Sequence, residues 1–419
     1  MPRAPAMPSS VSAESLRLAV FTDTALPQLN GVSHTLDRLL HGVRARGGAV
    51  RLFTTTDPDS ADEADVVRYA SVPFPTYPQV RFAAPRARTA AAELRRWGAT
   101  LVHVATPFGL GVAGRRAARA LGVPLVTSYH TSLHTYATYC RLHAFTEAGW
   151  AYLRWFHNGG LRTYCPTHAV ERELSGRGLR GTAVWGRGVD VQRFNPGRRS
   201  DELRTRLGAG DGRLLVAYVG RLASEKGLDV ALAAMRRLHA AAPDRFAFAF
   251  AGDGPYSDRC RRLAPPGSVF TGQLVGDALG AFYASADVFV FPSAIDTFGN
   301  VLLEAMASGL TVVAADTGPT REVLAGGGLT FPVGDDGTLA AVLRALDANP
   351  ARRRSVAAAG LAVARRRTWS RVFDELVADY LVVHAGARLP ALGARLSARP
   401  RAHAERREPS ARNRTVSSR

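Results

Sequence analysis

Short apolar runs alternate along this chain with longer segments in which apolar residues recur every three or four positions. The short runs predict buried β-strands, and the periodic segments predict amphipathic α-helices. In the first half we expect strands at residues 16–21, 49–54, 66–69, 101–104 and 124–128, and helices near Val32 and at 85–97 and 111–121. Such alternation is typical of a parallel sheet with helices on both faces.

The alternation restarts after a segment rich in Gly, Arg and Pro at residues 186–212, which we interpret as an interdomain connection. Further strands are expected at 214–219, 246–251, 288–291 and 311–315, and a late helix over 370–383. These strands are nearly all apolar, as central parallel strands are. The sequence therefore predicts an α/β fold of two doubly wound domains that face each other across a cleft, with ligands at the carboxyl ends of the strands.

Five parts are expected along the chain. They are a flexible N-terminus (1–15), a first domain (16–190), a second domain (191–368), a late helix that rejoins the first domain (about 369–386), and a disordered tail (387–419). The tail is rich in Arg and has few large apolar residues, so it cannot bury enough surface to fold alone.

The compartment is predicted from segments that the sequence lacks. No run of 18 apolar residues occurs, so no transmembrane helix is expected, and the N-terminus does not resemble a secretory signal. Cys140, Cys165 and Cys260 are far apart and show no metal-ligand spacing. Buried thiols in a reducing cytosol explain them, and we expect a cytoplasmic protein without a metal site.

The charge balance favours polyanionic partners. The chain has 54 basic and 35 acidic residues, for a formal net charge of +19. Phosphates, nucleic acid and an anionic membrane surface are all attracted by such an excess. Lys226 is the only lysine, which indicates a position where a compact ammonium is needed instead of the planar guanidinium of Arg.

The most informative stretch runs from Phe291 to Gly309, where a buried strand ends and a helix begins. Asp296 lies in the loop, Gly299 opens the helix, and Glu304 follows one turn later. Free N–H groups at a helix start bind anions, and the two carboxylates suit a ligand with hydroxyls at both ends, such as a nucleotide sugar. An N-terminal cap followed by a surface Glu explains the same residues equally well.

A second candidate loop follows the strand at residues 214–219 and carries Arg221 and Lys226. Two cations at the carboxyl end of a strand are placed to clamp a pyrophosphate. A solvated basic loop is the alternative, and the isolated lysine favours the functional interpretation.

Two further features lie in the first half. Gly31 lets a backbone approach a phosphate closely, although an ordinary turn explains it better when it is taken alone. His130 follows the strand at 124–128 at its carboxyl end, where catalytic groups gather, whereas His134 fits a structural role. The spacing of the loop around Gly31 is not G-x-G-x-x-G, and no G-x-x-x-x-G-K-[ST] occurs, which argues against a Rossmann dinucleotide fingerprint in that loop and against a P-loop.

Together these features resemble glycosyltransferase family 4, retaining enzymes with the GT-B fold of two Rossmann-like domains. The resemblance covers about residues 16–385. Its motifs are Pro27…Asn30-Gly31-Val32, Tyr129-His130-Thr131, Gly220-Arg221…Glu225-Lys226-Gly227, Ala251-Gly252-Asp253-Gly254-Pro255, and Pro292-Ser…Asp296…Glu304…Gly309. The last is the E-x7-E motif of the family, and Asp296 stands where most members have Glu. The shorter carboxylate is a departure that bears on sugar selectivity.

The resemblance implies roles for individual residues of the second domain, which would bind the nucleotide sugar. Arg221 and Lys226 would hold the donor diphosphate and stabilise it as it leaves. Asp296, with backbone N–H groups near Phe298 and Gly299, would hold the sugar hydroxyls.

The remaining roles involve both domains. Glu304 would accept hydrogen bonds from the ribose, and N–H groups at Asn300 and Val301 would meet the phosphate. Asn30 and Gly31 of the first, acceptor-side domain would approach the phosphate, and His130 would lie beside the sugar.

The resemblance also implies the reaction. The sugar would be transferred with retention of configuration, without a metal, and the departing phosphate would accept the acceptor's proton. The segments 185–190 and 298–300 look most like those of bacterial GDP-mannose-dependent α-mannosyltransferases, with a lipid or glycan acceptor. A UDP-sugar-dependent glycolipid glycosyltransferase of the sulfoquinovosyl or glucosyl type is the alternative. A GT-B nucleotide-sugar epimerase and a non-catalytic nucleic-acid-binding protein are less favoured, and no nucleic-acid partner is expected.

A basic segment can be interpreted in two ways, one of which concerns how the protein reaches a lipid acceptor. It contains Arg81, Phe82, Arg86, Arg88, Arg95, Arg96 and Trp97. It fits either a surface that lies on anionic headgroups at the inner membrane face or a solvated Arg-rich helix.

Overall fold

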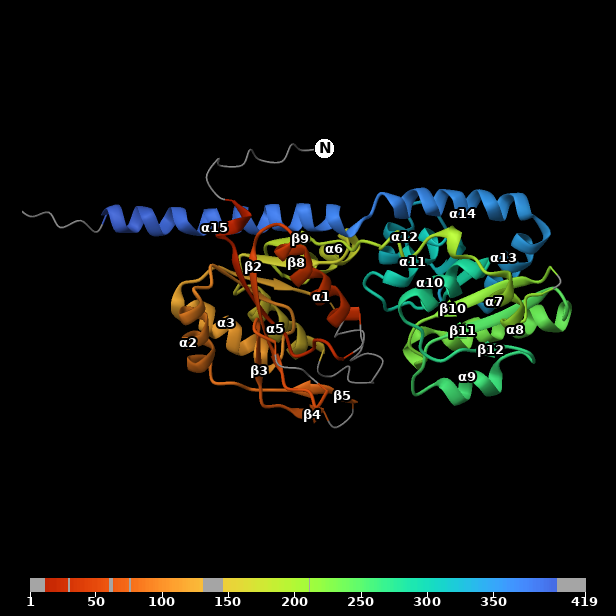
Figure 1. The fold of residues 1–419 in the computed structure, drawn as a ribbon, viewed down its shortest axis with the longest axis horizontal. Helices are drawn as coiled ribbons and strands as arrows, with labels where there is room; N and C mark the ends of the chain where they lie inside the picture. Colours follow the sequence, from red (N-terminus) through yellow and green to blue (C-terminus); the bar gives the residue numbers. More distant parts are fainter. Residues whose placement is uncertain are drawn as a thin grey trace, which may run out of the picture.

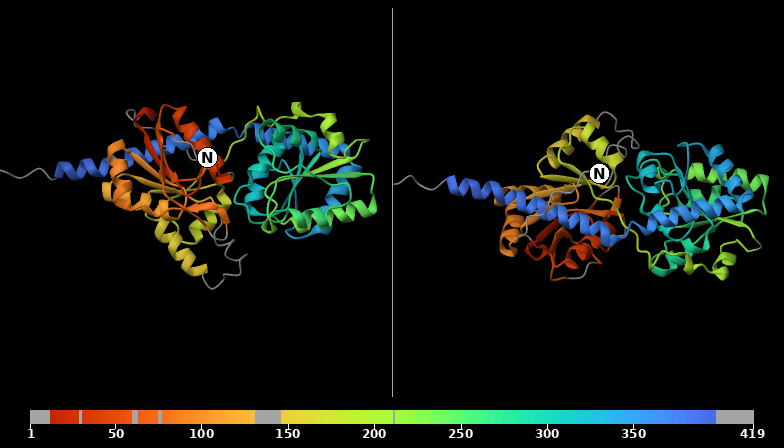
Figure 2. Two further views of the ribbon diagram at one scale, coloured as in Figure 1. Left: turned by 60° about the horizontal axis from the view of Figure 1, so that its bottom comes forward. Right: turned by 90° about the horizontal axis from the view of Figure 1, so that it is seen from above.

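The structure, a computed structural model, describes residues 12–28, 31–59, 63–74, 77–130, 146–210 and 212–397. The described chain forms two lobes that lie side by side, each built around a parallel β-sheet with helices on its faces (Figures 1 and 2). The predicted α/β class with two doubly wound sheets is confirmed.

The first lobe contains a seven-stranded sheet of order β3-β2-β1-β6-β7-β8-β9 in which all neighbours are parallel. Its strands are β1 (Arg17–Phe21), β2 (Ala49–Thr55), β3 (Val66–Tyr69), β6 (Leu101–Val104), β7 (Leu125–Ser128), β8 (Arg162–Cys165) and β9 (Thr182–Val184). Its helices are α1 (Gly31–Arg44), α2 (Ala87–Trp97), α3 (Gly109–Leu121), α5 (Thr146–His157) and α6 (His168–Gly176). An antiparallel hairpin, β4 (Val72–Phe74) and β5 (Tyr77–Phe82), stands apart from the sheet.

The second lobe contains a six-stranded parallel sheet of order β12-β11-β10-β13-β14-β15. Its strands are β10 (Leu214–Val219), β11 (Phe246–Ala251), β12 (Val269–Phe270), β13 (Val288–Phe291), β14 (Thr311–Ala315) and β15 (Leu329–Phe331). Its helices are α7 (Asp201–Arg206), α8 (Leu228–Ala241), α9 (Ser257–Leu263), α10 (Gly276–Ser285), α11 (Asn300–Ala307), α12 (Gly318–Leu324), α13 (Asp336–Ala348) and α14 (Pro350–Arg365).

The central strands of both sheets were predictable because helices cover both of their faces. Every residue of β10, β11, β13 and β14 is buried, so the strands are continuous apolar runs. The shorter strands β8, β9, β12 and β15 and the hairpin were not predicted. Their sequences are brief, and the edge strands β9 and β12 are only partly buried, so they carry little of the apolar signal.

The last helix, α15 (Trp369–Ser397), is longer than predicted. Residues 387–397, expected to begin a disordered tail, continue the helix, although Pro390 and Gly393 disfavour a helix interior. Residues 13–15, expected to be flexible, form a short 3-10 helix. The rest of the predicted tail lies outside the described residues.

Helix α15 belongs to the first lobe although it ends the chain. Phe373, Leu376, Val377 and Tyr380 are buried in the core of that lobe, and the helix packs against α1 (Figure 1). The chain therefore crosses between the lobes twice. The two crossings pair with each other, because Val189 N–H donates to the Arg367 carbonyl at 2.8 Å.

The predictions about the cysteines and about transmembrane helices can be compared with the structure. Cys165 and Cys260 are buried free thiols, and Cys140 lies outside the described residues. No helix among the described residues is long and apolar enough to cross a membrane.

The packing of α15 on α1 yields a stability prediction. A Cβ atom at the buried Gly42 would overlap the Phe373 ring near its attachment point. We expect Gly42→Ala to lower the free energy of unfolding by about 1–3 kcal/mol, because the ring cannot swing away without moving α15. Denaturant unfolding followed by circular dichroism measures this change.

Gly149→Ala is the matched control, because Gly149 is exposed on α5 and a Cβ there would meet nothing within 4 Å. It should raise stability by about 0.5–1 kcal/mol through helix propensity alone. Equal effects of the two substitutions would contradict the proposed packing.

Candidate active site

The candidate site lies where the carboxyl ends of the two sheets face each other. Asp296 follows β13 and Lys226 follows β10, the neighbouring strand. The ammonium Nζ of Lys226 donates to Asp296 Oδ1 at 2.8 Å and to Oδ2 at 3.0 Å. Both side chains keep about a fifth of their surface exposed, 20% for Lys226 and 24% for Asp296. The only lysine of the chain is thus held at an accessible position.

Gly227 positions this ion pair. Its φ of 71° is left-handed, and a Cβ atom there would lie 2.5 Å from the Pro292 carbonyl oxygen. Only glycine adopts this φ without strain and also fits this close to a carbonyl oxygen. The loop that ends in Gly227 therefore packs directly against the end of β13, which brings Lys226 to Asp296.

Arg221 is the second cation of the same loop. Its guanidinium forms an ion pair with Glu225, whose side chain is only 6% exposed. Glu225 lies in one of the family motifs, but no role was predicted for it from the sequence. An i to i+4 spacing between Arg and Glu in a loop signals this pairing only weakly, because such spacing brings charges together reliably in helices alone.

The start of α11 is the predicted phosphate position. Phe298 is buried, and Gly299 adopts a left-handed φ of 76° as the N-cap. Asn300 and Val301 are the first two helical residues, whose N–H groups have no partner within the helix. The partial positive charge of the helix terminus lies directly after the loop of Asp296.

Glu304 lies on α11 in a partly buried position beside the lobe interface. It accepts a hydrogen bond from the Tyr283 hydroxyl at 3.0 Å. Burial raises the pKa of Glu304 to about 7, while the Tyr283 bond and the charges of Arg193 and Arg38 oppose the shift. Arg38 comes from α1 of the first lobe, so Glu304 faces the opposite wall of the cleft. Tyr283, Arg193 and Arg38 were missed because only the fold brings them to α11.

Thr297 joins the two lobes at this point. Its hydroxyl donates to the main-chain carbonyl of His130 at 3.1 Å, and its own carbonyl accepts from the Thr167 hydroxyl at 3.4 Å. The structure therefore brings His130 of the first lobe to the residue after Asp296. Sequence reasoning proposed both His130 and Asp296 but could not show that they meet.

Both ring nitrogens of His130 are engaged. Arg187 lies 3.1 Å from Nδ1, and the Ser128 hydroxyl lies 2.8 Å from Nε2. Arg can only donate, so Nδ1 accepts and Nε2 carries the hydrogen. The Ser128 hydroxyl hydrogen is then left for His103 Nε2 at 2.8 Å, and His103 Nδ1 lies 2.7 Å from the Tyr380 hydroxyl of α15.

The surroundings keep His130 neutral. Burial, reinforced by the positive charge of Arg187, lowers the pKa of His130 well below its ordinary value. Burial likewise lowers the pKa of His103 to about 3. A neutral His130 with both nitrogens occupied is a positioned dipole, and it does not carry a titrating proton near neutral pH.

The remaining predicted positions fall at the same edge or outside the described chain. Gly31 is the first residue of α1, and a Cβ atom there would meet nothing within 4 Å. Asn30 and His134 lie outside the described residues. Within the described ranges, no group of three or more His, Cys, Asp or Glu side chains is arranged to hold a metal ion.

Comparison with known proteins agrees with this arrangement. The family model described as Glycosyltransferase Family 4 matches residues 29–193, and the model described as Glycosyl transferases group 1 matches residues 213–349. The chain belongs to glycosyltransferase family 4 and is a glycosyltransferase.

Curated relatives match almost the whole chain. A GDP-mannose-dependent alpha-mannosyltransferase of Mycolicibacterium smegmatis is 35% identical, covering 88% of this chain and 98% of the relative. The protein of the same name in Mycobacterium tuberculosis is 36% identical, covering 88% and 97%. A sulfoquinovosyl transferase of Arabidopsis thaliana is 34% identical over 76% of this chain and 62% of the relative.

Solved structures show the same fold. Sucrose-phosphate synthase from Thermosynechococcus elongatus has a TM-score of 0.74 at 20% identity, covering 88% of this chain and all of that one. WaaG, a glycosyltransferase of lipopolysaccharide biosynthesis, has a TM-score of 0.65 at 16% identity, covering 86% and 98%. The predicted GT-B fold is confirmed.

The hydrogen-bond directions around His130 can be tested by ¹⁵N NMR of histidine-labelled protein. We expect the His130 ring to be neutral, with Nδ1 unprotonated, and not to titrate between about pH 5 and 8, because burial and Arg187 disfavour the imidazolium. Comparison with His130→Gln assigns the signal.

In Arg187→Met the donor to Nδ1 is lost, so the tautomer preference should weaken while the ring stays in place. A His130 signal that titrates near its ordinary pKa in the unmodified protein would contradict this arrangement.

Proposed function

We propose that this chain is a retaining glycosyltransferase that transfers mannose from GDP-mannose to a lipid or glycan acceptor. The observation that carries the proposal is the Lys226–Asp296 pair beside the start of α11. It places a cation, a carboxylate and free helix N–H groups at one point, which suits a sugar linked to a diphosphate. The choice of GDP-mannose is supported by the names of the relatives from the two mycobacteria.

In this proposal the two cations bind the diphosphate. Arg221 and Lys226 contribute positive charge where negative charge develops as the nucleotide leaves, and they do so without a metal ion. The N–H groups of Asn300 and Val301 meet the phosphate at the helix start.

The carboxylates bind hydroxyl groups. Asp296, with the N–H groups near Phe298 and Gly299, holds the sugar, and donor binding would draw Lys226 from Asp296 toward the phosphate. Glu304 accepts hydrogen bonds from the ribose. The shorter Asp296 sits farther from the sugar than a Glu would, which bears on which hydroxyls it reaches.

The first lobe completes the cleft. Gly31, with no atom within 4 Å of the position of a Cβ, leaves room at the start of α1 for the phosphate, and Asn30 precedes it in the sequence. His130 lies beside the sugar as a neutral dipole that positions it.

Retention follows in this proposal from the absence of an available protein nucleophile among the described residues of the cleft. Asp296 binds the sugar hydroxyls in this proposal, Glu225 is paired with Arg221, and Glu304 accepts from Tyr283. The departing phosphate is then the base nearest to the reacting carbon, and it accepts the proton of the acceptor hydroxyl on the face from which it leaves.

One alternative has its own support. The similarity to a sulfoquinovosyl transferase, and 30% identity to an alpha-monoglucosyldiacylglycerol synthase of Streptococcus pneumoniae, favour a glycolipid product and hence a lipid acceptor. In this alternative the donor is a UDP-sugar, and the protein lies peripherally on the inner membrane face.

The basic segment at 81–97 is divided in the structure. Arg81 bonds to Ser71 within the hairpin region, and Trp97 is partly buried beneath Arg17 at 4.8 Å and Arg51 at 5.2 Å. The exposed charges that remain for an anionic surface are those of Arg86, Arg88 and Arg95 on α2 and its N-cap, whereas Arg96 is exposed but forms an ion pair with Glu93.

Nucleotide binding tests the proposal directly. We expect GDP to raise the midpoint of thermal unfolding, with a gain of about 2.7 kcal/mol at a concentration 100 times the dissociation constant. Lys226→Ala should remove most of this gain because it removes a diphosphate contact. Differential scanning fluorimetry with GDP, UDP and ADP measures it.

Arg365→Ala is the control, since it removes an exposed cation of α14 and should leave the shift unchanged. A shift with UDP alone would mean that the donor is a UDP-sugar, while the glycosyltransferase activity would remain the proposed function. No shift with any nucleotide, in folded protein, would overturn the nucleotide-sugar cleft.

The raised pKa of Glu304 predicts a pH dependence of donor binding. Ribose hydroxyls that donate to Glu304 favour its ionised form, so binding lowers the pKa of Glu304 from about 7. GDP affinity should therefore rise as the pH increases through about 7 and fall below it. Isothermal titration calorimetry across this range measures the trend.

Glu304→Gln cannot ionise and should bind GDP with a flat profile over the same range. A slope that persists in Glu304→Gln would assign the pH dependence to another group.

A further inference from the structure

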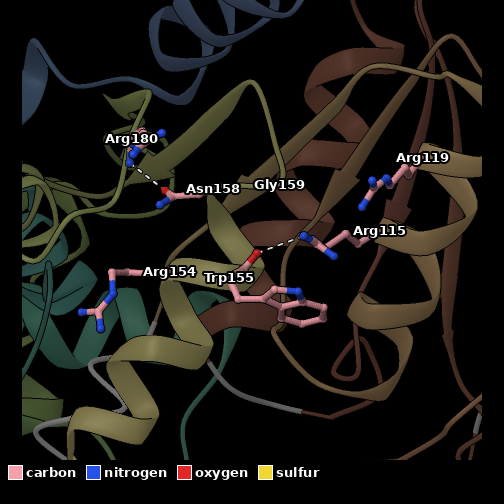
Figure 3. Close-up of a pocket in the computed structure, with 7 residues that line it drawn as sticks. All are labelled: Arg115, Arg119, Arg154, Trp155, Asn158, Gly159 and Arg180. Carbon is pink, nitrogen blue, oxygen red and sulfur yellow. Dashed lines mark hydrogen bonds between the residues drawn. The ribbon is translucent and has the colours of Figure 1, made fainter.

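A second pocket lies in the first lobe, outside the proposed donor site. It has a volume of about 610 Å³ and lies between α3, the end of α5 and the loop before β9 (Figure 3). Its lining residues are Arg115, Arg119, Arg154, Trp155, Asn158, Gly159 and Arg180. None of these residues was singled out by the sequence analysis or used in the proposed function.

The connectivity places this pocket at the opposite edge of the sheet from the cleft. Helix α3 leaves the carboxyl end of β6 and returns toward the amino end of β7, so Arg115 and Arg119 lie on its returning half. Trp155 and Asn158 lie at the end of α5, just before β8, and Arg180 lies just before β9. The pocket is therefore distinct from the site of Lys226 and Asp296.

Arg115 is held rigidly in the pocket wall. It donates to the Trp155 carbonyl at 3.0 Å, and its guanidinium lies 4.1 Å from the centre of the Trp155 ring (Figure 3). The absence of a side chain at Gly159 makes room for it, since a Cβ there would lie 2.6 Å from Nη2. Its Nε is buried and has no hydrogen-bond acceptor among the described residues. One donor of a fixed guanidinium is thus left unsatisfied.

Other residues that line the pocket are also held in place by hydrogen bonds. Asn158 accepts from Arg180 N–H at 2.8 Å and donates to the Gly178 carbonyl at 3.0 Å, which ties the loop before β9 to the end of α5 (Figure 3). Arg154 donates to the Arg177 carbonyl at 3.4 Å. The pocket is thus built by contacts between α3, α5 and this loop.

The positive charge of the pocket is not neutralised within the described chain. No described carboxylate forms an ion pair with Arg115, Arg119, Arg154 or Arg180. Elsewhere arginines do meet carboxylates, as in Arg46–Asp374, Arg204–Asp287 and Arg245–Asp347. Burial, together with the like charges of Arg119 and Arg116, lowers the pKa of Arg115, because like charges nearby disfavour its charged form. An anion would offset those like charges.

We propose that this arginine pocket binds a phosphate group. Guanidinium groups present paired N–H donors that match phosphate oxygens, and those of Arg115, Arg119, Arg154 and Arg180 line this one pocket. This goes beyond the proposed function and does not rest on it.

The phosphate has two sources, a soluble phosphate ester or the headgroup of an anionic lipid. The second is included because an adjoining groove of about 570 Å³ is lined by the exposed aromatic side chains of Phe82, Phe108 and Tyr152. The Tyr152 ring is 5.6 Å from that of Trp155, so the groove and the pocket lie next to each other.

Calorimetric titration with inorganic pyrophosphate tests the proposal. Every protein carries Lys226→Ala, so that phosphate binding in the cleft is weakened. The pocket variant adds Arg115→Gln and Arg154→Gln. The matched control adds Arg172→Gln and Arg365→Gln, which remove the same charge from exposed positions on other helices. Circular dichroism confirms that each variant is folded.

We expect saturable binding that weakens about tenfold or more in the pocket variant, as for the loss of charge-assisted hydrogen bonds, and less than about twofold in the control. Equal weakening in both variants would mean that the net charge of the chain attracts the anion diffusely. Unchanged binding in the pocket variant would also overturn the proposal.

Flotation with vesicles of phosphatidylglycerol and phosphatidylcholine in equal amounts distinguishes the sources. Loss of flotation in the pocket variant but not in the control would identify a lipid phosphodiester as the ligand. Retained flotation together with lost pyrophosphate binding would identify a soluble phosphate ester. If the pocket variant keeps both flotation and pyrophosphate binding, the proposed phosphate site is wrong.

Discussion

The arrangement of the cleft depends on one charge-assisted contact between the lobes. The carboxylate of Glu322, on α12 of the second lobe, accepts from the N–H groups of His168 at 2.8 Å and Ala169 at 2.9 Å. These groups form the positive N-terminus of α6 in the first lobe, so a full negative charge meets a helix dipole. Arg367 supports the same turn by donating to the carbonyls of Glu322 at 2.9 Å and Val323 at 3.2 Å.

This contact packs α12 against α6, so that the carboxyl ends of the two sheets face each other. The other contacts between the lobes then come within reach. Thr297 then reaches the carbonyl of His130, and Arg38 of α1 comes close enough to act on Glu304. The ion pair of Lys226 with Asp296 lies inside this frame. Asp296, Thr297 and His130 come from loops that follow strands, whereas Arg38 and Glu304 lie within α1 and α11, and the buried sheets supply the rigidity.

Much of the site was visible in the sequence because its residues lie in short motifs. Arg221 and Lys226 share one loop, and Asp296 to Glu304 span another, so their order along the chain already placed them at strand ends. Arg187, Tyr283 and Thr297 gave no such signal. Arg187 reaches His130 across 57 residues, and Thr297 does so across 167, and neither spacing follows from any local periodicity.

Local patterns in the sequence were enough to predict the two parallel sheets, the positions of their central strands and the membership in a glycosyltransferase family, because buried strands and phosphate-binding loops leave such patterns. The neutral state of His130, and the nitrogen that carries its hydrogen, depend instead on the folded surroundings, since burial and Arg187 set both. The fold also gathers arginines of α3, α5 and the loop before β9 into a pocket. Charges that are scattered along a chain become a site only when packing places them together.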